Sequence, residues 1–285
     1  MGAGAPARLL VSAPAELAEL AQEAARTAGE LLLERAAAGA ELEVSSKSTP
    51  TDLVSEADLA SERAIRELLR QQRPDDGFVG EEGGDEAGSS GLSWVVDPLD
   101  GTINFLFGIP QWCVSVAVTD ADGTVAGAIF DPNRGELFSA TRDGPAKMLT
   151  GGEERVLGTA GRQGQGGARH PGKVELAGAM VATGLSYSAE VRAAQAKVLE
   201  RVIPRVRDIR RFGSAALDLA WTALGRYDAY FERAVKQWDV AAGALICECA
   251  GLSVLELPVH ENLPWGILTA PEELAQELLE LAGGP

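Results

Sequence analysis

Two kinds of periodicity divide the sequence. Between residues 93 and 140, apolar residues alternate with period two in short runs such as 112–119, and an Asp122-Gly123 turn separates two of these runs. Such alternation with tight turns is typical of antiparallel β-strands, whereas helical patterns surround this region. We expect strands at residues 94–96, 112–119, 124–130, 136–139, 180–183, 227–232 and 253–257, and helices at 15–37, 55–71, 190–203, 214–224, 238–250 and 272–281. The sequence therefore predicts an α+β fold with layers of helix and mixed sheet.

The composition favours a globular chain with a substantial core. Hydrophobic residues make up 46% of the 285 residues and charged residues 24%, which excludes a disordered chain. Composition alone does not decide between one large domain and two smaller ones. We expect an N-terminal α+β half over about 1–157 and a C-terminal α/β half over about 173–285. Two glycine-rich stretches, 83–91 and 159–172, are expected to be mobile loops, and the second separates the halves.

A surplus of acidic residues limits the partners that the chain can bind. The formal net charge is −17 at pH 7, and such a surface repels nucleic-acid phosphates and anionic lipid headgroups. The N-terminal segment lacks the sustained apolar stretch of a signal peptide, and the three cysteines do not form a disulfide framework. We therefore expect a cytoplasmic protein with reduced cysteines that binds neither nucleic acid nor membrane.

The segment WVVDPLDGTINF places two carboxylates directly after an apolar strand. The proline between them favours a turn, so Asp97 and Asp100 can point into one cavity. Magnesium prefers carboxylate, carbonyl and water oxygens, and these two side chains and the Leu99 carbonyl offer them. The backbone N–H groups of Gly101 and Thr102 follow at the start of a helical turn and suit a phosphate oxygen. Aspartate is also common in ordinary turns, so this segment alone does not decide the function.

Three further acidic residues, in two segments, have ordinary explanations when each segment is considered alone. Glu81 and Glu82 are consistent with a solvated loop, and Asp239 is consistent with a charge that complements the N-terminal end of a helix. Other chemistries find less support, because the histidines His170 and His260 are isolated and the sequence holds no HExxH or CxxC pattern.

Taken together, these segments resemble the inositol monophosphatase family, within the metal-dependent, lithium-sensitive phosphatase superfamily. The resemblance runs from KSTPTDLVSEAD (47–58) through VGEE, DPLDGTINF and GELFSA to QWDVAAG, and so spans nearly the whole chain. It implies a single domain over 1–285 with the layered αβαβα sandwich of inositol monophosphatases and fructose-1,6-bisphosphatases, and a homodimer. The chain departs from the family pattern at Gly251-Leu252, where a Gly-Gly pair is usual, and at residues 145–150.

The resemblance also implies a role for each matching residue. The implied metal ligands are Glu81, Asp97, Leu99 through its carbonyl, Asp100 and Asp239, for two or three Mg²⁺ ions with Asp97 as a bridge. The implied catalytic residues are Glu81, which helps deprotonate the attacking water, and the hydrogen-bonded pair Thr102 and Asp58. The implied substrate-binding residues are Asp100, Gly101, Thr102, Gly213, Ser214, Ala215 and Glu232.

These roles imply Mg²⁺-dependent hydrolysis of a phosphomonoester of a small polyol, inositol monophosphate above all, with inhibition by lithium. Glu232 favours this substrate, because a carboxylate accepts hydrogen bonds from free hydroxyls. Histidinol phosphate, fructose 1,6-bisphosphate and 3′-phosphoadenosine 5′-phosphate remain alternatives, and the cations available for a second phosphate are Arg192, Arg207, Arg210 and Arg211. A regulatory protein without activity is the alternative of another class, and the intact set of mutually repelling carboxylates argues against it.

Overall fold

The computed structural model describes residues 13–38, 44–46, 53–158 and 175–283. Its helices are α1 (Pro14–Ala38), α2 (Glu56–Gln72), α3 (Thr102–Leu106), α4 (Ala189–Val202), α5 (Ala215–Leu224), α6 (Gln237–Cys249) and α7 (Glu272–Ala282). Each helix longer than α3 begins and ends within one residue of the range expected from the sequence. The expected loop at 159–172 lies outside the described residues.

The first sheet contains eight strands in the order β10-β9-β8-β7-β6-β5-β3-β4. All neighbours are antiparallel except β3 and β5, which pair in parallel. The strands are β3 (Gly77–Gly80), β4 (Gly84–Glu86), β5 (Ser93–Asp100), β6 (Cys113–Asp120), β7 (Gly123–Asp131), β8 (Glu136–Thr141), β9 (Lys147–Thr150) and β10 (Glu153–Val156). A separate antiparallel pair is formed by β1 (Val44–Ser46) and β2 (Leu53–Ser55).

The second sheet contains five strands in the order β12-β11-β13-β15-β14. Strand β11 pairs in parallel with both β12 and β13, whereas β15 is antiparallel to β13 and β14. The strands are β11 (Met180–Thr183), β12 (Asp208–Arg210), β13 (Ala229–Arg233), β14 (Ser253–Leu257) and β15 (Gly266–Ala270).

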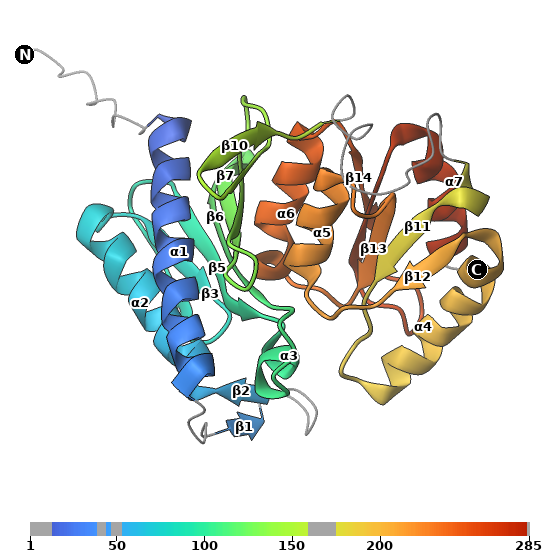
Figure 1. The fold of residues 1–285 in the computed structure, drawn as a ribbon, viewed down its shortest axis with the longest axis horizontal. Coiled ribbons are helices and arrows are strands. Elements are labelled where there is room, and N and C mark those ends of the chain that lie inside the picture. The colour runs from blue at the N-terminus through green and yellow to red at the C-terminus, as the bar shows by residue number, and fades with distance from the viewer. Residues whose placement is uncertain (1–12, 39–43, 47–52, 159–174, 284–285) are drawn as a thin grey trace, which may run out of the picture.

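Helices and sheets alternate in five layers (Figure 1). One apolar core joins α1 and α2 to the eight-stranded sheet. A second core places α5 and α6 between the two sheets, and a third joins α4 and α7 to the outer face of the five-stranded sheet. The order helix, sheet, helix, sheet, helix confirms the αβαβα sandwich expected from the sequence.

Two local expectations were wrong. Residues 83–91, expected to form a mobile loop, contain β4, whose Glu86 bonds to Arg66 and Arg70 of α2, while Ser89 N donates to Asp75 O. The strand expected at 94–96 continues through Asp100, with an irregular register between Asp97 and Asp100. A bulge of this kind tolerates a proline, because the missing N–H group is not needed in the ladder.

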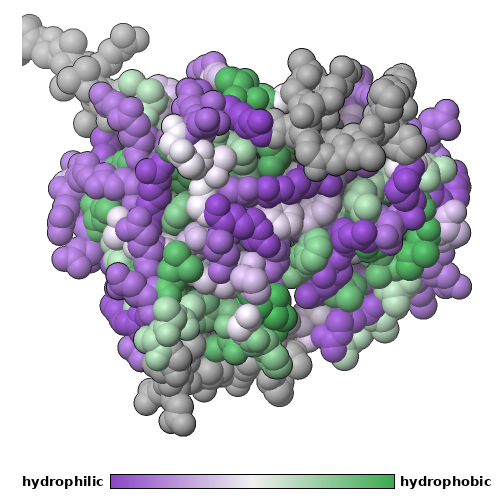
Figure 2. All heavy atoms as spheres, viewed as in Figure 1, coloured by the Kyte–Doolittle hydropathy of each residue, from purple (hydrophilic) through white to green (hydrophobic). Residues whose placement is uncertain are grey.

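The central helices pack closely on the eight-stranded sheet. A Cβ atom at Gly127 of β7 would lie 2.9 Å from Ala242 Cα of α6, so the absence of a side chain permits this approach. The face in Figure 2 is mostly hydrophilic, and hydrophobic side chains gather at its lower edge, over α3. Phe107 and Ile109, just after α3, are exposed. Within the described ranges, no helix is both long and apolar enough to cross a membrane.

Candidate active site

A cavity of about 450 Å³ opens where β5, α3, α5, α6 and the end of β13 meet. The sequence-predicted residues that line it are Glu81, Asp97, Leu99, Asp100, Gly101, Thr102, Gly213, Ala215, Glu232 and Asp239. Asp58 and Ser214 are the predicted residues that do not line it, since both are buried behind its wall. The fold thus brings together residues more than 150 positions apart in the sequence.

Asp58 holds the start of α3 from the first turn of α2. Its Oδ2 accepts hydrogen bonds from Ser55 N at 2.8 Å and Ser55 Oγ at 2.5 Å, which fixes the carboxylate at the helix N-terminus. Its Oδ1 accepts a hydrogen bond from Thr102 Oγ1 at 2.8 Å. The same hydroxyl lies 3.0 Å from the Leu99 carbonyl oxygen, so one proton has two alternative acceptors. The expected pairing of Asp58 with Thr102 is therefore present.

Two other residues of α2, for which the sequence alone indicated no role, hold the acidic turns. Ser61 Oγ donates to Pro98 O at 2.7 Å. Glu62 Oε2 accepts a hydrogen bond from Glu82 N at 2.8 Å, and Arg66 pairs with the other oxygen of Glu62 at 2.9 Å. These contacts join positions about 20 and 37 residues apart, and the helical spacing of residues 58, 61 and 62 was their only sequence signal.

The turn from β5 into α3 depends on its own backbone. Asp97 Oδ1 accepts a hydrogen bond from Leu99 N at 3.0 Å, as in an Asx turn. Gly101 then adopts a φ of 100°, and a Cβ atom there would lie 2.8 Å from Gln111 O. Only glycine combines this conformation with this clearance. The turn directs Asp97, Asp100 and Thr102 to the same cavity.

Asp100 is held from the other half of the chain. Its Oδ2 accepts hydrogen bonds from Ser214 Oγ and Ala216 N, both at 2.7 Å. Ser214, expected to line the phosphate and polyol region, instead caps α5 and supports Asp100 from behind. Asn104, a residue of the DPLDGTINF segment without an expected role, donates to Phe212 O at 2.6 Å and so ties α3 to the segment before α5.

Asp239 and Glu232 complete the acidic lining from the five-stranded sheet and α6. Asp239 lies in the first turn of α6, where its Oδ2 accepts a hydrogen bond from Lys236 N at 2.6 Å. Glu232 lies near the end of β13 and its Oε2 accepts a hydrogen bond from Tyr230 Oη at 2.8 Å. Arg211 also lines the cavity, and its charge favours the ionised form of Glu232.

Burial makes the ionised forms of these carboxyl groups unfavourable. It raises the pKa of Asp97 well above the ordinary value, and the charges of Glu81, Asp100 and Asp239 add to the shift. Burial likewise raises the pKa of Asp239, raises that of Asp100 to about 6 and raises that of Glu232 to about 7. The cavity therefore concentrates negative charge at a cost that a cation would offset.

The acidic side chains of the cavity do not form a finished coordination sphere. Among the described residues, no lysine or arginine forms an ion pair with Asp97, Asp100 or Asp239. In the same part of the chain, no three histidine, cysteine or carboxylate side chains are grouped closely enough to hold a metal ion.

In a chelator, we expect the melting temperature to fall as pH rises from about 4.5 to about 7.5. The raised pKa values mean that the native state binds more protons than the unfolded chain, so the free energy of unfolding decreases with pH. Asp100 lowers the free energy of unfolding between pH 3.8 and about pH 6, and Glu232 lowers it between pH 4.5 and about pH 7. Scanning fluorimetry measures it, and Asp97→Asn should flatten the slope. A wild-type melting temperature that is constant or increases over this range would contradict the electrostatic description.

Comparison with known proteins agrees with the fold. The profile of the inositol monophosphatase family matches residues 13–281. Inositol-1-monophosphatase SuhB of Mycobacterium tuberculosis is 42% identical over 242 residues, which cover 83% of this chain and 80% of the relative. A relative named Nus factor SuhB, from Pasteurella multocida, is 38% identical over 91% of this chain and 93% of its own.

Solved structures give the same result. The extragenic suppressor protein suhB of Bartonella henselae superposes with a TM-score of 0.80 at 33% identity, covering 94% of this chain and 98% of that one. Mycobacterium tuberculosis SuhB gives a TM-score of 0.78 at 36% identity, covering 95% and 97%. This chain belongs to the inositol monophosphatase family. It is a phosphoric monoester hydrolase of the inositol-1-monophosphatase type.

Proposed function

We propose that this protein hydrolyses inositol monophosphate to inositol and phosphate, with magnesium ions held by Glu81, Asp97, the Leu99 carbonyl, Asp100 and Asp239. The observation that carries the proposal is the lining of one cavity, in which these oxygen donors and the carboxylate of Glu232 occur together. The oxygen donors suit a metal-assisted attack of water on phosphorus, and the carboxylate of Glu232 suits recognition of a polyol.

The donor set fits magnesium by its chemistry. It consists of carboxylates and one backbone carbonyl, which are the oxygen ligands that a hard divalent cation prefers. When bound, magnesium compensates the charge of the cavity and of the phosphate and lowers the pKa of water. The acidic side chains are not grouped as a coordination cluster among the described residues. The residues that would hold the cations are Glu81, Asp97, Asp100, Asp239 and Leu99 through its carbonyl. Lithium inhibition belongs to the same proposal.

The side chains around the turn would orient and deprotonate the attacking water. Glu81 would accept its proton as a general base. The single proton of Thr102 has Asp58 and the Leu99 carbonyl as alternative acceptors. If the carbonyl serves as a metal ligand, Thr102 donates to Asp58, and the Thr102 oxygen then remains free to accept a hydrogen bond from the water. The backbone N–H groups of Gly101 and Thr102 would donate to the phosphate.

Glu232 should contribute to the KM for a polyol substrate. Its carboxylate can accept charge-assisted hydrogen bonds from ring hydroxyls, each worth about 1.5–3 kcal/mol. We expect Glu232→Gln to raise the KM for inositol monophosphate roughly tenfold, while the kcat/KM for an aryl phosphate and the magnesium dependence change little. Steady-state kinetics on both substrates measure the difference. Equal losses on the two substrates, or no loss on either, would contradict a role in polyol binding.

A phosphate-release screen tests the proposed substrate. The panel contains inositol 1-phosphate, histidinol phosphate, fructose 1,6-bisphosphate and 3′-phosphoadenosine 5′-phosphate, each with magnesium and with chelator. We expect magnesium-dependent release with the highest kcat/KM for inositol 1-phosphate. A preference for a bisphosphate would instead point to Arg211, which lines the cavity. No release from any ester would favour the alternative of a regulatory protein without activity, which relatives named Nus factor SuhB also suggest.

The remaining features of the proposal concern the whole protein. The net charge of −17 supports a protein that binds small cations and metal-neutralised anions rather than nucleic acid or membranes. The exposed side chains of Phe107 and Ile109 support a homodimer. We also propose a cytoplasmic location. We further propose that the chain is a single folding unit, because helices of the C-terminal half pack on strands of the N-terminal half.

A further inference from the structure

The register of the second sheet places Gly184 beside Glu232. Strands β11 and β13 run in parallel, and Thr183 is the partner of Phe231. Gly184, the residue just after β11, and Glu232, the next residue of β13, therefore lie side by side on the opposite face. A methyl group built on Gly184 would overlap the Cδ, Oε1 and Oε2 atoms of Glu232. The glutamate carboxylate thus lies directly over the backbone of Gly184.

Tyr230 also holds the carboxylate of Glu232, from the same face of β13. It lies two residues before Glu232, and its hydroxyl donates to Glu232 Oε2 at 2.8 Å. The ring is fully buried in the core between the two sheets. A buried ring can change its conformation only at the cost of its packing, so this hydrogen bond fixes one oxygen of Glu232.

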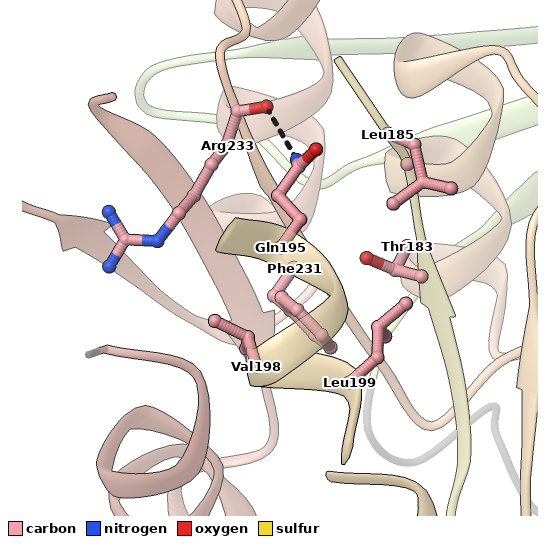
Figure 3. Close-up of a pocket in the computed structure, with 8 residues that line it drawn as sticks. Thr183, Leu185, Gln195, Val198, Leu199, Phe231 and Arg233 are labelled. Atoms are coloured by element: carbon pink, nitrogen blue, oxygen red, sulfur yellow. Dashed lines mark hydrogen bonds between the residues drawn. The ribbon is translucent and has the colours of Figure 1, made fainter. Parts of the chain in front are cut away.

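Gln195 connects the segments that carry Gly184 and Glu232. From α4, its Nε2 donates to Arg233 O at 3.5 Å, as the dashed line in Figure 3 marks, and its Oε1 accepts a hydrogen bond from Ser186 N at 2.9 Å. The side chain of Gln195 is buried. It therefore joins the residue after Glu232 to the segment after Gly184, close to a residual cavity of only about 10 Å³.

We propose that Gly184 and Tyr230 are positioning residues that fix the carboxylate of Glu232 in one orientation, and so set the selectivity for polyol phosphates. This inference rests on the proposed function of Glu232. Gly184 supplies the space that the carboxylate occupies, and Tyr230 supplies the hydrogen bond that selects its rotamer. Preorganisation of this kind lowers the entropy lost when the hydroxyls of the substrate bind.

The test is Gly184→Ala in the full-length enzyme. The φ angle of Gly184 lies outside the left-handed region, so alanine is compatible with the backbone and acts by displacing the carboxylate. We expect the KM for inositol 1-phosphate to rise about tenfold, with kcat and the KM for an aryl phosphate within twofold of wild type. Gly178→Ala is the matched control, because a Cβ atom there has no neighbour closer than 4.0 Å.

A double-mutant cycle shows whether the effect acts through Glu232. In a Glu232→Ala background the added methyl group has no carboxylate to displace, so Gly184→Ala should raise the KM no further. An equal rise in both backgrounds would overturn the proposal. Tyr230→Phe provides an independent variant if Gly184→Ala folds poorly by scanning fluorimetry, and we expect it to raise the same KM roughly threefold.

The outcomes separate this inference from the proposed function. If Glu232→Gln raises the KM for inositol 1-phosphate but Gly184→Ala and Tyr230→Phe do not, the positioning role is wrong and the role of Glu232 stands. If Glu232→Gln leaves that KM unchanged, polyol recognition by Glu232 is wrong, and the positioning role falls with it.

Discussion

Replacing Asp97 with asparagine is expected to reduce magnesium-dependent phosphate release about a thousandfold, on the order of 4 kcal/mol in the barrier. Asp97 is the proposed shared ligand of two cations, and a neutral amide is a poorer ligand than a carboxylate. The melting temperature in chelator should hold or rise, because the variant removes one of several buried charges that repel one another. Initial rates and scanning fluorimetry of the same preparation measure the two effects.

Asp122→Asn is the matched control for this prediction, since Asp122 is exposed in the turn between β6 and β7. It makes the same chemical change far from the cavity and should leave both quantities unchanged. Wild-type rates in Asp97→Asn would remove the two-metal mechanism. A large loss of stability in chelator would show that Asp97 has a structural role that its charge environment does not predict.

Thr102→Val is expected to lower kcat about a hundredfold while the KM changes less. Valine keeps the shape of threonine but removes the hydroxyl that donates to Asp58 Oδ1. The water would lose an acceptor, and Asp58 would lose a buried partner, with a cost to stability of about 1–3 kcal/mol. Steady-state kinetics and chemical denaturation measure these effects.

Thr102→Ser distinguishes the hydroxyl from the rest of the side chain. Serine retains the donor to Asp58, so it should recover most of the activity lost in Thr102→Val. If serine and valine are equally impaired, packing of the threonine methyl group, rather than orientation of water, explains the loss.

The local pattern of the sequence was sufficient for most helices. An apolar face and terminal signals predicted α2, and a terminal glycine helped to predict α6, and with them the positions of Asp58 and Asp239 at helix N-termini. Strands were predicted where several residues alternate, as in β6 and β7. Short strands such as β4 and β12 were missed, because three residues hold too little periodicity to be distinguished from a loop.

The parts of the site that the sequence could not predict depend on distant contacts. Ser214 has an ordinary N-cap pattern, and nothing local indicates that its hydroxyl meets Asp100, 114 positions earlier. The dependence of Glu232 on Gly184 arises from the parallel register of β11 and β13. In the same way, Glu62 supports the acidic turn at Glu82 only after α2 packs beside β3. Each of these residues was visible in the sequence, but its partner was not.

The most direct test of the central claim is the rate of phosphate release from inositol 1-phosphate during a magnesium titration of chelator-treated enzyme. We expect a negligible rate without magnesium and a saturable increase as the ion is added, because bound cations must neutralise both the carboxylates of the cavity and the phosphate. A rate of hydrolysis that is unaffected by chelator would contradict it, as would folded enzyme that releases no phosphate at saturating magnesium.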